Sequence, residues 1–419
     1  MDMKSALPPG MFDATRLTRA GRLTEAAAAP KQMLRGQVSP GSVNSQARSG
    51  PSTIYGVAEK ARATETECAA RAGPVAQPPF GITPGTMHPT MPDGLRGFFG
   101  HGGRGGLQVP GGKDPSPARS PVAVPAGAQF LAATFGNQAG SRPYKLYVPS
   151  NYRPGQLIPL IVMLHGCTQS PDDFAAGTRM NEAAEQHTCL VAYPGQTISA
   201  NMQKCWNWFS EGDQKRDGGE PSLIAGITRE VMSDYAVDPG RVYIAGLSAG
   251  GAAAAIMGDT YPDLYAAIGV HSGLACGAAH DIPSALTAMK QGDGGSVRRA
   301  VRSAPSGVHR RVIPTIVFHG DRDTTVNPRN GDAVAAQSAR ISALKTRVEK
   351  GQVPGGHAYS RTLHADANGQ TVIEQWVVHG AGHAWFGGSP TGSYTDPRGP
   401  DATKELLRFF LAHPIPWDR

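Results

Sequence analysis

From residue 144 onward, short apolar runs alternate with stretches of helical pattern. Alternating apolar and polar residues at 144–148 predict a half-exposed strand, whereas continuous apolar runs predict strands that are covered on both faces. The continuous runs occupy residues 159–164, 189–193, 241–245, 266–270 and 313–318, and the last strand is expected at 371–378. Helical patterns occupy residues 172–187, 221–236, 249–261, 330–347 and 401–412. This alternation predicts an α/β fold with a doubly wound, mostly parallel sheet.

The chain before residue 131 has a different composition. Residues 71–130 contain 13 glycines and 11 prolines without a collagen-like period, so they bury too little apolar surface to offset their chain entropy. Residues 13–26 have the pattern of a short amphipathic helix, which is either solvated and marginally stable or docks weakly on a partner or membrane surface. We therefore expect a helix and leader at 1–35, a disordered Gly/Pro-rich linker at 36–130 and one folded domain at 131–413.

The formal net charge of +7 is unevenly distributed. Residues 1–140 carry 14 Lys and Arg against 8 Asp and Glu, whereas residues 141–419 carry 26 against 25. A nearly neutral domain without a basic stripe or interleaved aromatic residues is not typical of nucleic-acid binding. The basic leader favours at most a weak contact with an anionic surface.

Targeting and metal-binding signals are sparse. No apolar run approaches the roughly 20 residues of a transmembrane helix. Residues 1–9 lack the apolar region of a secretory signal, which favours a cytoplasmic location or export by another route. The chain has no H-E-x-x-H motif and no metal-spaced Asp/His cluster, so we expect no metal. An odd number of cysteines without a C-x-x-C pair favours reduced thiols at Cys68, Cys167, Cys189, Cys205 and Cys276.

Ser248 lies in the pattern G-x-S-x-G at residues 246–250. The pattern follows the predicted strand 241–245 and precedes a predicted helix, which is the context of a nucleophile elbow. Small residues are needed there because the serine occupies a strained turn in which larger neighbours would collide. A serine nucleophile also needs a base, an acid that orients the base, and donors for the oxyanion.

The orienting acid is expected after the strand at 313–318, where two aspartates compete. We predict Asp323, because the spacing H-G-x-x-D-x-x-V places it beyond the glycine turn and Val326 anchors the loop. Asp321 is interpreted as a turn cap or a partner of Arg322.

The base is expected after the last strand, in the sequence H-G-A-G-H at residues 379–383. His383 lies in a glycine-rich loop that can bring its imidazole over the elbow, whereas His379 belongs to the strand end. The order serine, aspartate, histidine is the one found in α/β hydrolases. Structural roles are expected for three other histidines at strand ends, His165, His271 and His319.

The oxyanion donors are expected to be the backbone amides of Ala249 and Cys167. Ala249 follows the nucleophile, and Cys167 follows a His-Gly turn after the strand at 159–164. Cys205 either forms a disulfide with Cys167 that braces this turn, or the two thiols are unpaired. The aromatic cluster with Trp206 and Trp208 is either core or, together with Trp385, a substrate-binding wall.

Several separate motifs resemble the esterase, poly(3-hydroxybutyrate) depolymerase family. They occur in order, within a resemblance that covers residues 130–413, at residues 164–169, 176–181, 205–209, 246–251 and 270–274. The resemblance implies an α/β-hydrolase fold without a cofactor and a triad of Ser248, Asp323 and His383. It also implies oxyanion contacts from Cys167 and Ala249 and favours a Cys167–Cys205 disulfide.

The resulting hypothesis is a serine carboxylesterase that forms an acyl-enzyme. Its expected substrates are short-chain hydroxyalkanoate esters or their polymer. One alternative is a feruloyl or acetylxylan esterase, and another is a non-catalytic protein that binds polyester granules or membrane surfaces. The resemblance implies an extracellular location, whereas the absence of a secretory signal in residues 1–9 favours a cytoplasmic location or export by another route.

Overall fold

The computed structural model describes residues 122, 124–292, 313–339 and 344–416. The predicted helix and leader at 1–35, and nearly all of the predicted linker, lie outside the described residues. The first strand, β1 (Gln129–Asn137), begins within the stretch assigned to the linker. Phe130 of this strand packs edge-on against Tyr147 and Tyr193, with ring centroids 6.4 and 5.8 Å apart. Antiparallel pairing with the following strand, β2 (Gly140–Val148), therefore orders a segment whose own composition predicts a linker.

The described residues contain a ten-stranded sheet with the order β1-β2-β4-β3-β5-β6-β7-β10-β9-β8. The six central strands from β4 to β10 are parallel, and two antiparallel strands flank them at each edge. This arrangement confirms the predicted mostly parallel α/β sheet. Besides β1, the strands are β2 (Gly140–Val148), β3 (Ile158–Leu164), β4 (Leu190–Pro194), β5 (Val237–Leu247), β6 (Ala267–His271), β7 (Thr315–Gly320), β8 (Lys345–Gln352), β9 (Ala358–Ala365) and β10 (Thr371–Val378).

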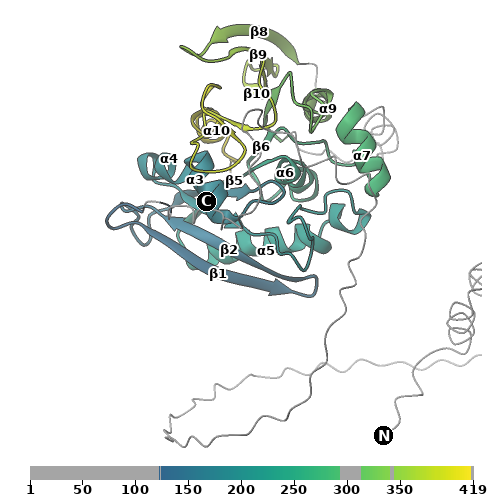
Figure 1. The fold of residues 1–419 in the computed structure, drawn as a ribbon. Helices are drawn as coiled ribbons and strands as arrows, with labels where there is room; N and C mark the ends of the chain where they lie inside the picture. Colours follow the sequence, from purple (N-terminus) through teal and green to yellow (C-terminus); the bar gives the residue numbers. More distant parts are fainter. Residues whose placement is uncertain (1–121, 123, 293–312, 340–343, 417–419) are drawn as a thin grey trace, which may run out of the picture. The chain divides into compact units, whose positions relative to one another are not determined.

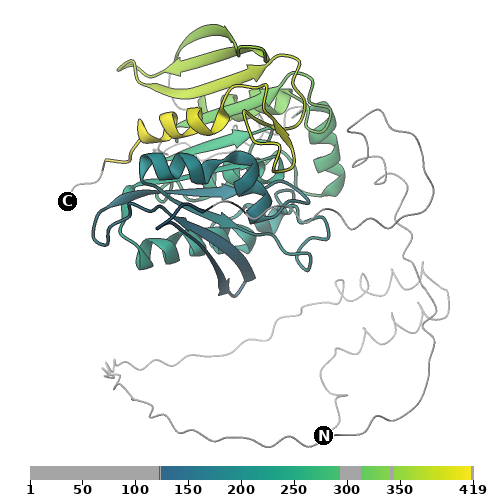
Figure 2. The same cartoon turned by 60° about the vertical axis from the view of Figure 1, so that its left-hand side comes forward.

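Helices cover both faces of this sheet, and each face has its own hydrophobic core (Figures 1 and 2). One core includes residues of α5 (Gly219–Asp234), α6 (Ala249–Thr260), α7 (Ile282–Gln291) and α9 (Arg329–Ser338). The other core includes residues of α3 (Pro171–Thr178), α4 (Met180–His187) and α10 (Ala402–Leu411). Within the described part of the chain, none of these helices is long and apolar enough to cross a membrane.

Two helix predictions differ from the structure. The segment expected as one helix at 172–187 is divided into α3 and α4 at Arg179, which has a left-handed φ of 57°. The helix expected at 330–347 ends at Ser338, and β8 begins at Lys345. Apolar and polar residues do not alternate regularly in β8 (KTRVEKGQ), but β8 pairs antiparallel with β9 over its whole length. This pairing with the next strand along the chain overrides the helical pattern.

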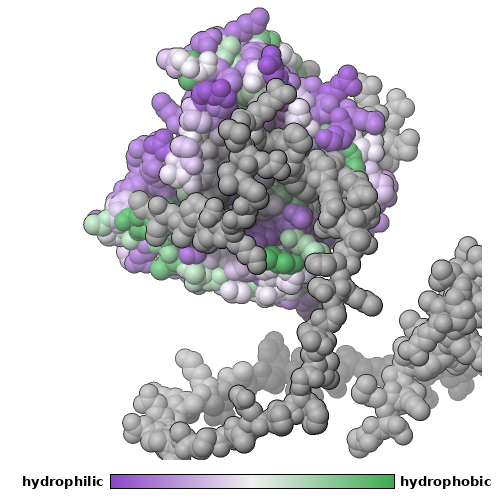
Figure 3. All heavy atoms as spheres, in the orientation of Figure 1, coloured by the Kyte–Doolittle hydropathy of each residue, from purple (hydrophilic) through white to green (hydrophobic). Residues whose placement is uncertain are grey.

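The face drawn in Figure 3 is mainly hydrophilic where the described residues are visible. Its hydrophobic residues form small separate areas rather than one continuous patch. This face therefore shows no extended hydrophobic surface among the visible described residues.

Gly246 and Gly250 let the turn after β5 pack against the neighbouring strand. A Cβ atom on Gly250 would lie 2.1 Å from the Leu164 carbonyl oxygen, and one on Gly246 would lie 2.3 Å from the Gly250 carbonyl carbon. Both neighbours are backbone atoms, which cannot move aside as a flexible side chain can. The small residues of the G-x-S-x-G pattern are thus required by backbone contact.

We expect Gly250→Ala to lower the free energy of unfolding by about 3 kcal/mol, because the added methyl group overlaps the Leu164 carbonyl. Urea denaturation followed by circular dichroism measures this change. Gly212→Ala is the matched control, since nothing lies within 4 Å of the position of its Cβ. Equal stability of the two variants would contradict this explanation of the turn.

Candidate active site

Ser248 occupies a strained turn between β5 and α6. Its backbone angles are φ 58° and ψ −119°, a left-handed φ that is rare for residues other than glycine. The Ser248 amide donates a 2.9 Å hydrogen bond to the carbonyl of His271, at the end of the adjacent strand β6. The side chain is half-buried. The local geometry has the form of the predicted nucleophile elbow.

Asp323 and His383 are directly hydrogen-bonded. His383 Nδ1 lies 2.7 Å from Asp323 Oδ2, and the Asp323 side chain is completely buried. The other carboxylate oxygen accepts hydrogen bonds from the amides of Thr325 and Val326, at 2.9 and 2.8 Å. The loop after β7 therefore fixes the carboxylate so that it orients the imidazole.

His319 is a second imidazole beside the same carboxylate. Its Nε2 atom lies 2.9 Å from the Val326 carbonyl oxygen and 3.4 Å from Asp323 Oδ2. Burial alone raises the pKa of Asp323, but the hydrogen bonds from His319 and His383 outweigh it and hold that pKa well below its usual range. Asp323 is consequently ionised wherever a histidine base would function.

His271 connects the elbow with the segment that carries His383. Its carbonyl accepts from Ser248, while its Nε2 accepts a 3.1 Å hydrogen bond from the amide of Phe386. Phe386 belongs to the short strand β11 (Trp385–Phe386), which pairs with β12 (Thr395–Asp396) soon after His383. Burial and the nearby imidazoles of His319 and His383 hold the pKa of His271 well below its usual range. His271 is therefore neutral and links two parts of the site.

The turn after β3 lies against the elbow on its other side. A Cβ atom on Gly166 would lie 3.5 Å from the Ser248 Cβ atom. We call residues 165–168 the oxyanion turn. The amides of Cys167 and Ala249 have no hydrogen-bond partner among the described residues. Two free amides next to a nucleophile can stabilise an oxyanion.

A loop at residues 196–207, here named the bracing loop, holds the oxyanion turn. The sulfur atoms of Cys167 and Cys205 are bonded at 2.00 Å, and the Thr168 amide donates to the Gln203 carbonyl at 2.6 Å. The possible disulfide left open by the sequence is thus present in the structure. Of the other described cysteines, Cys189 is a buried free thiol.

The imidazole of His165 gives the same loop a further contact with the turn. Its Nε2 atom accepts a 3.0 Å hydrogen bond from the Gln196 amide, and its Nδ1 atom lies 2.7 Å from the Gly166 carbonyl oxygen. Burial, the dominant influence, lowers the pKa of His165 to about 4. A neutral His165 therefore has the structural role expected for it. Among the described residues, no group of three or more His, Cys, Asp and Glu side chains is placed to hold a metal ion.

The three tryptophans expected as a substrate-binding wall are buried. Trp206 and Trp385 are almost fully inaccessible, and Trp208 is only 6% exposed. Their indole rings belong to the cores on the two faces of the sheet. The Trp206 N–H donates to the His165 carbonyl and the Trp385 N–H to Thr403 Oγ1, each at 3.1 Å. Their apolar surface is used for packing, so the prediction of an exposed wall is not met.

Three other apolar side chains lie on the bracing loop or contact the oxyanion turn, and they are exposed. Ile198 and Met202 lie on the bracing loop and are 63% and 76% exposed, and Tyr394 is 44% exposed. The Tyr394 hydroxyl lies 3.3 Å from the Thr168 hydroxyl. We call these three residues the apolar rim. Sequence reasoning missed them because single apolar residues in polar loops carry no pattern that distinguishes them from core.

Asp321, the rival acid, has a different partner. His379 Nδ1 lies 2.9 Å from Asp321 Oδ2, and His379 Nε2 lies 2.9 Å from Ser360 Oγ. These residues form a second Ser-His-Asp arrangement that is partly exposed. Ser360, however, lies within β9, where Lys350 and Val377 are its neighbours on the two paired strands. This serine has none of the turn geometry of Ser248.

Comparisons with known proteins place the chain in a family and identify several relatives. The model of the family described as Esterase PHB depolymerase matches residues 142–350. The poly(3-hydroxyalkanoate) depolymerase C of Paucimonas lemoignei is 30% identical over 257 residues, which cover 60% of this chain and 60% of that protein. The acetylxylan esterase A of Talaromyces purpureogenus is 26% identical over 295 residues, covering 64% of this chain and 74% of that protein.

The solved structure of the acetyl xylan esterase from Aspergillus awamori is similar in fold. It has a TM-score of 0.53 and 22% sequence identity, and the likeness covers 68% of this chain and 99% of that chain. The likeness therefore concerns the α/β architecture, and the chemistry has to be argued from the side chains of this chain.

Proposed function

Because the chain belongs, through residues 142–350, to the esterase PHB depolymerase family, we propose that it is a serine ester hydrolase with Ser248 as its nucleophile. The observation that carries this proposal is the 2.7 Å hydrogen bond between His383 Nδ1 and the buried carboxylate of Asp323. The strained elbow follows β5 and the pair follows β7 and β10, which are parallel strands of one sheet. Ligands of such folds bind at the carboxyl ends of these strands.

In the first half of the reaction, Ser248 Oγ attacks the ester carbonyl and His383 Nε2 takes its proton. Asp323 accepts the Nδ1–H of His383 and stabilises the imidazolium that forms. The amides of Cys167 and Ala249 donate to the oxyanion of the tetrahedral intermediate. The intermediate collapses when His383 protonates the leaving alcohol, and an acyl-Ser248 ester remains.

In the second half, His383 removes a proton from water as the water attacks the acyl-enzyme. The same two amides stabilise the second oxyanion. Collapse returns the proton to Ser248 and releases the carboxylic acid. This cycle uses side chains and amides of the chain and consumes only ester and water.

For the substrate, we favour short-chain hydroxyalkanoate esters or their polymer. The name of the Paucimonas lemoignei relative supports this class, and so does the apolar rim of Ile198, Met202 and Tyr394, which suits an aliphatic chain. The Talaromyces purpureogenus relative supports the alternative of acylated plant-wall sugars. A non-catalytic granule-binding protein would have no use for the buried Asp323–His383 pair.

A turnover panel with the full chain tests this proposal. We expect hydrolysis of p-nitrophenyl butyrate and of 3-hydroxybutyrate oligomers, with kcat/KM for the oligomers about tenfold or more above that for feruloyl esters and acetylated xylan. The reverse preference would support the plant-wall alternative. Absence of turnover on every substrate, together with binding to polyester granules, would contradict an enzyme.

A further inference from the structure

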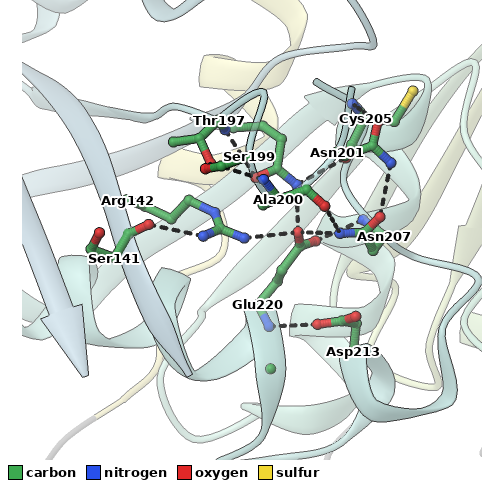
Figure 4. A network of polar contacts seen from close by, with 12 residues as sticks. Ser141, Arg142, Thr197, Ser199, Ala200, Asn201, Cys205, Asn207, Asp213 and Glu220 are labelled. Atoms are coloured by element: carbon green, nitrogen blue, oxygen red, sulfur yellow. Dashed lines mark hydrogen bonds and ion pairs between the residues drawn. The ribbon is translucent and has the colours of Figure 1, made fainter. Parts of the chain in front are cut away.

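Glu220 lies at the start of α5, outside the residues assigned to the reaction, in a buried polar network (Figure 4). Its side chain is 7% exposed. One carboxylate oxygen accepts hydrogen bonds from Asn207 Nδ2 at 2.8 Å and from the side-chain amide of Gln196, and the other accepts from the Asn207 backbone amide at 2.7 Å. Glu220 therefore contacts both ends of the bracing loop.

Among the described residues, the ion pair of Glu220 is with Arg142. Arg142 Nη2, on β2, lies 3.1 Å from Glu220 Oε1, and the Arg142 side chain is also buried. Burial raises the pKa of Glu220, while the Asn207 amide and the Gln196 side chain favour its ionised form. A carboxylate with this many donors holds the loop more strongly than a neutral group of the same shape.

The bracing loop connects Glu220 with the oxyanion turn through hydrogen bonds and a disulfide. Gln196 donates its amide to His165 Nε2 at 3.0 Å and its side chain to the Cys205 carbonyl at 2.9 Å. Cys205 is bonded to Cys167, whose amide is one of the two proposed oxyanion donors. Three bonds therefore connect Glu220 with the residue of an oxyanion donor: the hydrogen bonds from Gln196 to Glu220 and to Cys205, and the Cys205–Cys167 disulfide.

We propose that Glu220 is a positioning residue for ester hydrolysis, which holds the bracing loop so that the Cys167 amide points at the transition-state oxyanion. This inference rests on the proposed esterase function. Glu220 touches neither substrate nor the reacting atoms. Its removal moves a donor that acts on the transition state, so the effect falls on kcat rather than on substrate binding.

Glu220→Gln is the test variant. Its amide nitrogen replaces an oxygen that accepts a hydrogen bond from Asn207 or Gln196, so two donors face each other and that hydrogen bond is lost. We expect kcat for p-nitrophenyl butyrate to fall about 10- to 100-fold, below the loss seen when an oxyanion donor is deleted, with KM changed less than about twofold. An aryl trifluoromethyl ketone forms an anionic hemiketal with the nucleophile. Its inhibition constant is expected to rise by the same factor as kcat falls.

Glu230→Gln is the matched control, since Glu230 lies on the same helix but accepts its hydrogen bond from Tyr144, away from the bracing loop. It is expected to retain wild-type kcat and inhibitor affinity. If Glu220→Gln does not fold, Asn207→Ala removes one donor of the network from the loop side and carries the same expectation.

Three results would overturn the inference. One is a kcat for Glu220→Gln, or for its substitute Asn207→Ala, that equals that of Glu230→Gln. Another is a rise in KM in proportion to the loss of kcat/KM, and the third is unchanged affinity for the trifluoromethyl ketone. A wild-type chain without turnover would instead contradict the proposed function itself, and this inference with it.

Discussion

A Ser248→Ala variant is expected to lose about 10⁶-fold in kcat on p-nitrophenyl butyrate, because the acyl-enzyme cannot form without the hydroxyl group. The variant is also expected not to react with a fluorophosphonate, which labels the wild-type chain once. Mass spectrometry of the labelled peptide locates the modified serine, and stopped-flow or end-point assays measure the residual turnover.

The chain contains a matched control for this experiment. Ser360 has a histidine and an aspartate at hydrogen-bond distances similar to those of a triad, but it lies within a paired strand. Ser360→Ala is therefore expected to retain wild-type activity and labelling. Label on Ser360, or activity that survives in Ser248→Ala and is lost in Ser360→Ala, would show that the wrong serine has been assigned.

An Asp323→Asn variant is expected to lose about 10⁴-fold in kcat, as in comparable triads. The asparagine amide cannot accept the Nδ1–H of His383 as the carboxylate does, so the imidazole loses its orientation and the stabilisation of its cation. Because the pKa of Asp323 is held well below its usual range, the wild-type carboxylate is ionised throughout the pH range of the assay. The loss is therefore expected at every pH from about 6 to 9.

Asp321→Asn is the comparison that separates the two aspartates. Asp321 contacts His379 and the amide of Gly380, and its side chain is 37% exposed. Its substitution is expected to change kcat less than about threefold, as for surface hydrogen bonds away from a site. A larger loss in Asp321→Asn than in Asp323→Asn would mean that the catalytic pair is Asp321 with His379 and not Asp323 with His383.

The parts of the site that follow single strands are readable from the sequence. Ser248, Asp323 and His383 each lie just beyond an apolar run, and parallel strands bring their carboxyl ends to one edge. The sheet type and the family resemblance were predicted on the same local patterns and are confirmed. Residues that follow directly from one strand and its turn can thus be predicted before the fold is known.

The parts that depend on contacts between distant segments are not readable in this way. The burial of Trp206 and Trp385 depends on cores assembled from many elements, and an aromatic residue in a polar loop has the same local pattern in either case. Glu220 likewise resembles any acidic residue in the first turn of a helix. Only the return of the bracing loop to α5 gives it a buried network.

The two edges of the sheet differ in how they meet other chains. β8 carries charged side chains at Lys345, Arg347, Glu349 and Lys350, which oppose the addition of a further strand to its free edge. β1 at the opposite edge contains no charged residue in its nine positions. Of the two edges, β1 is therefore the one without charged side chains to oppose pairing with a strand of another chain.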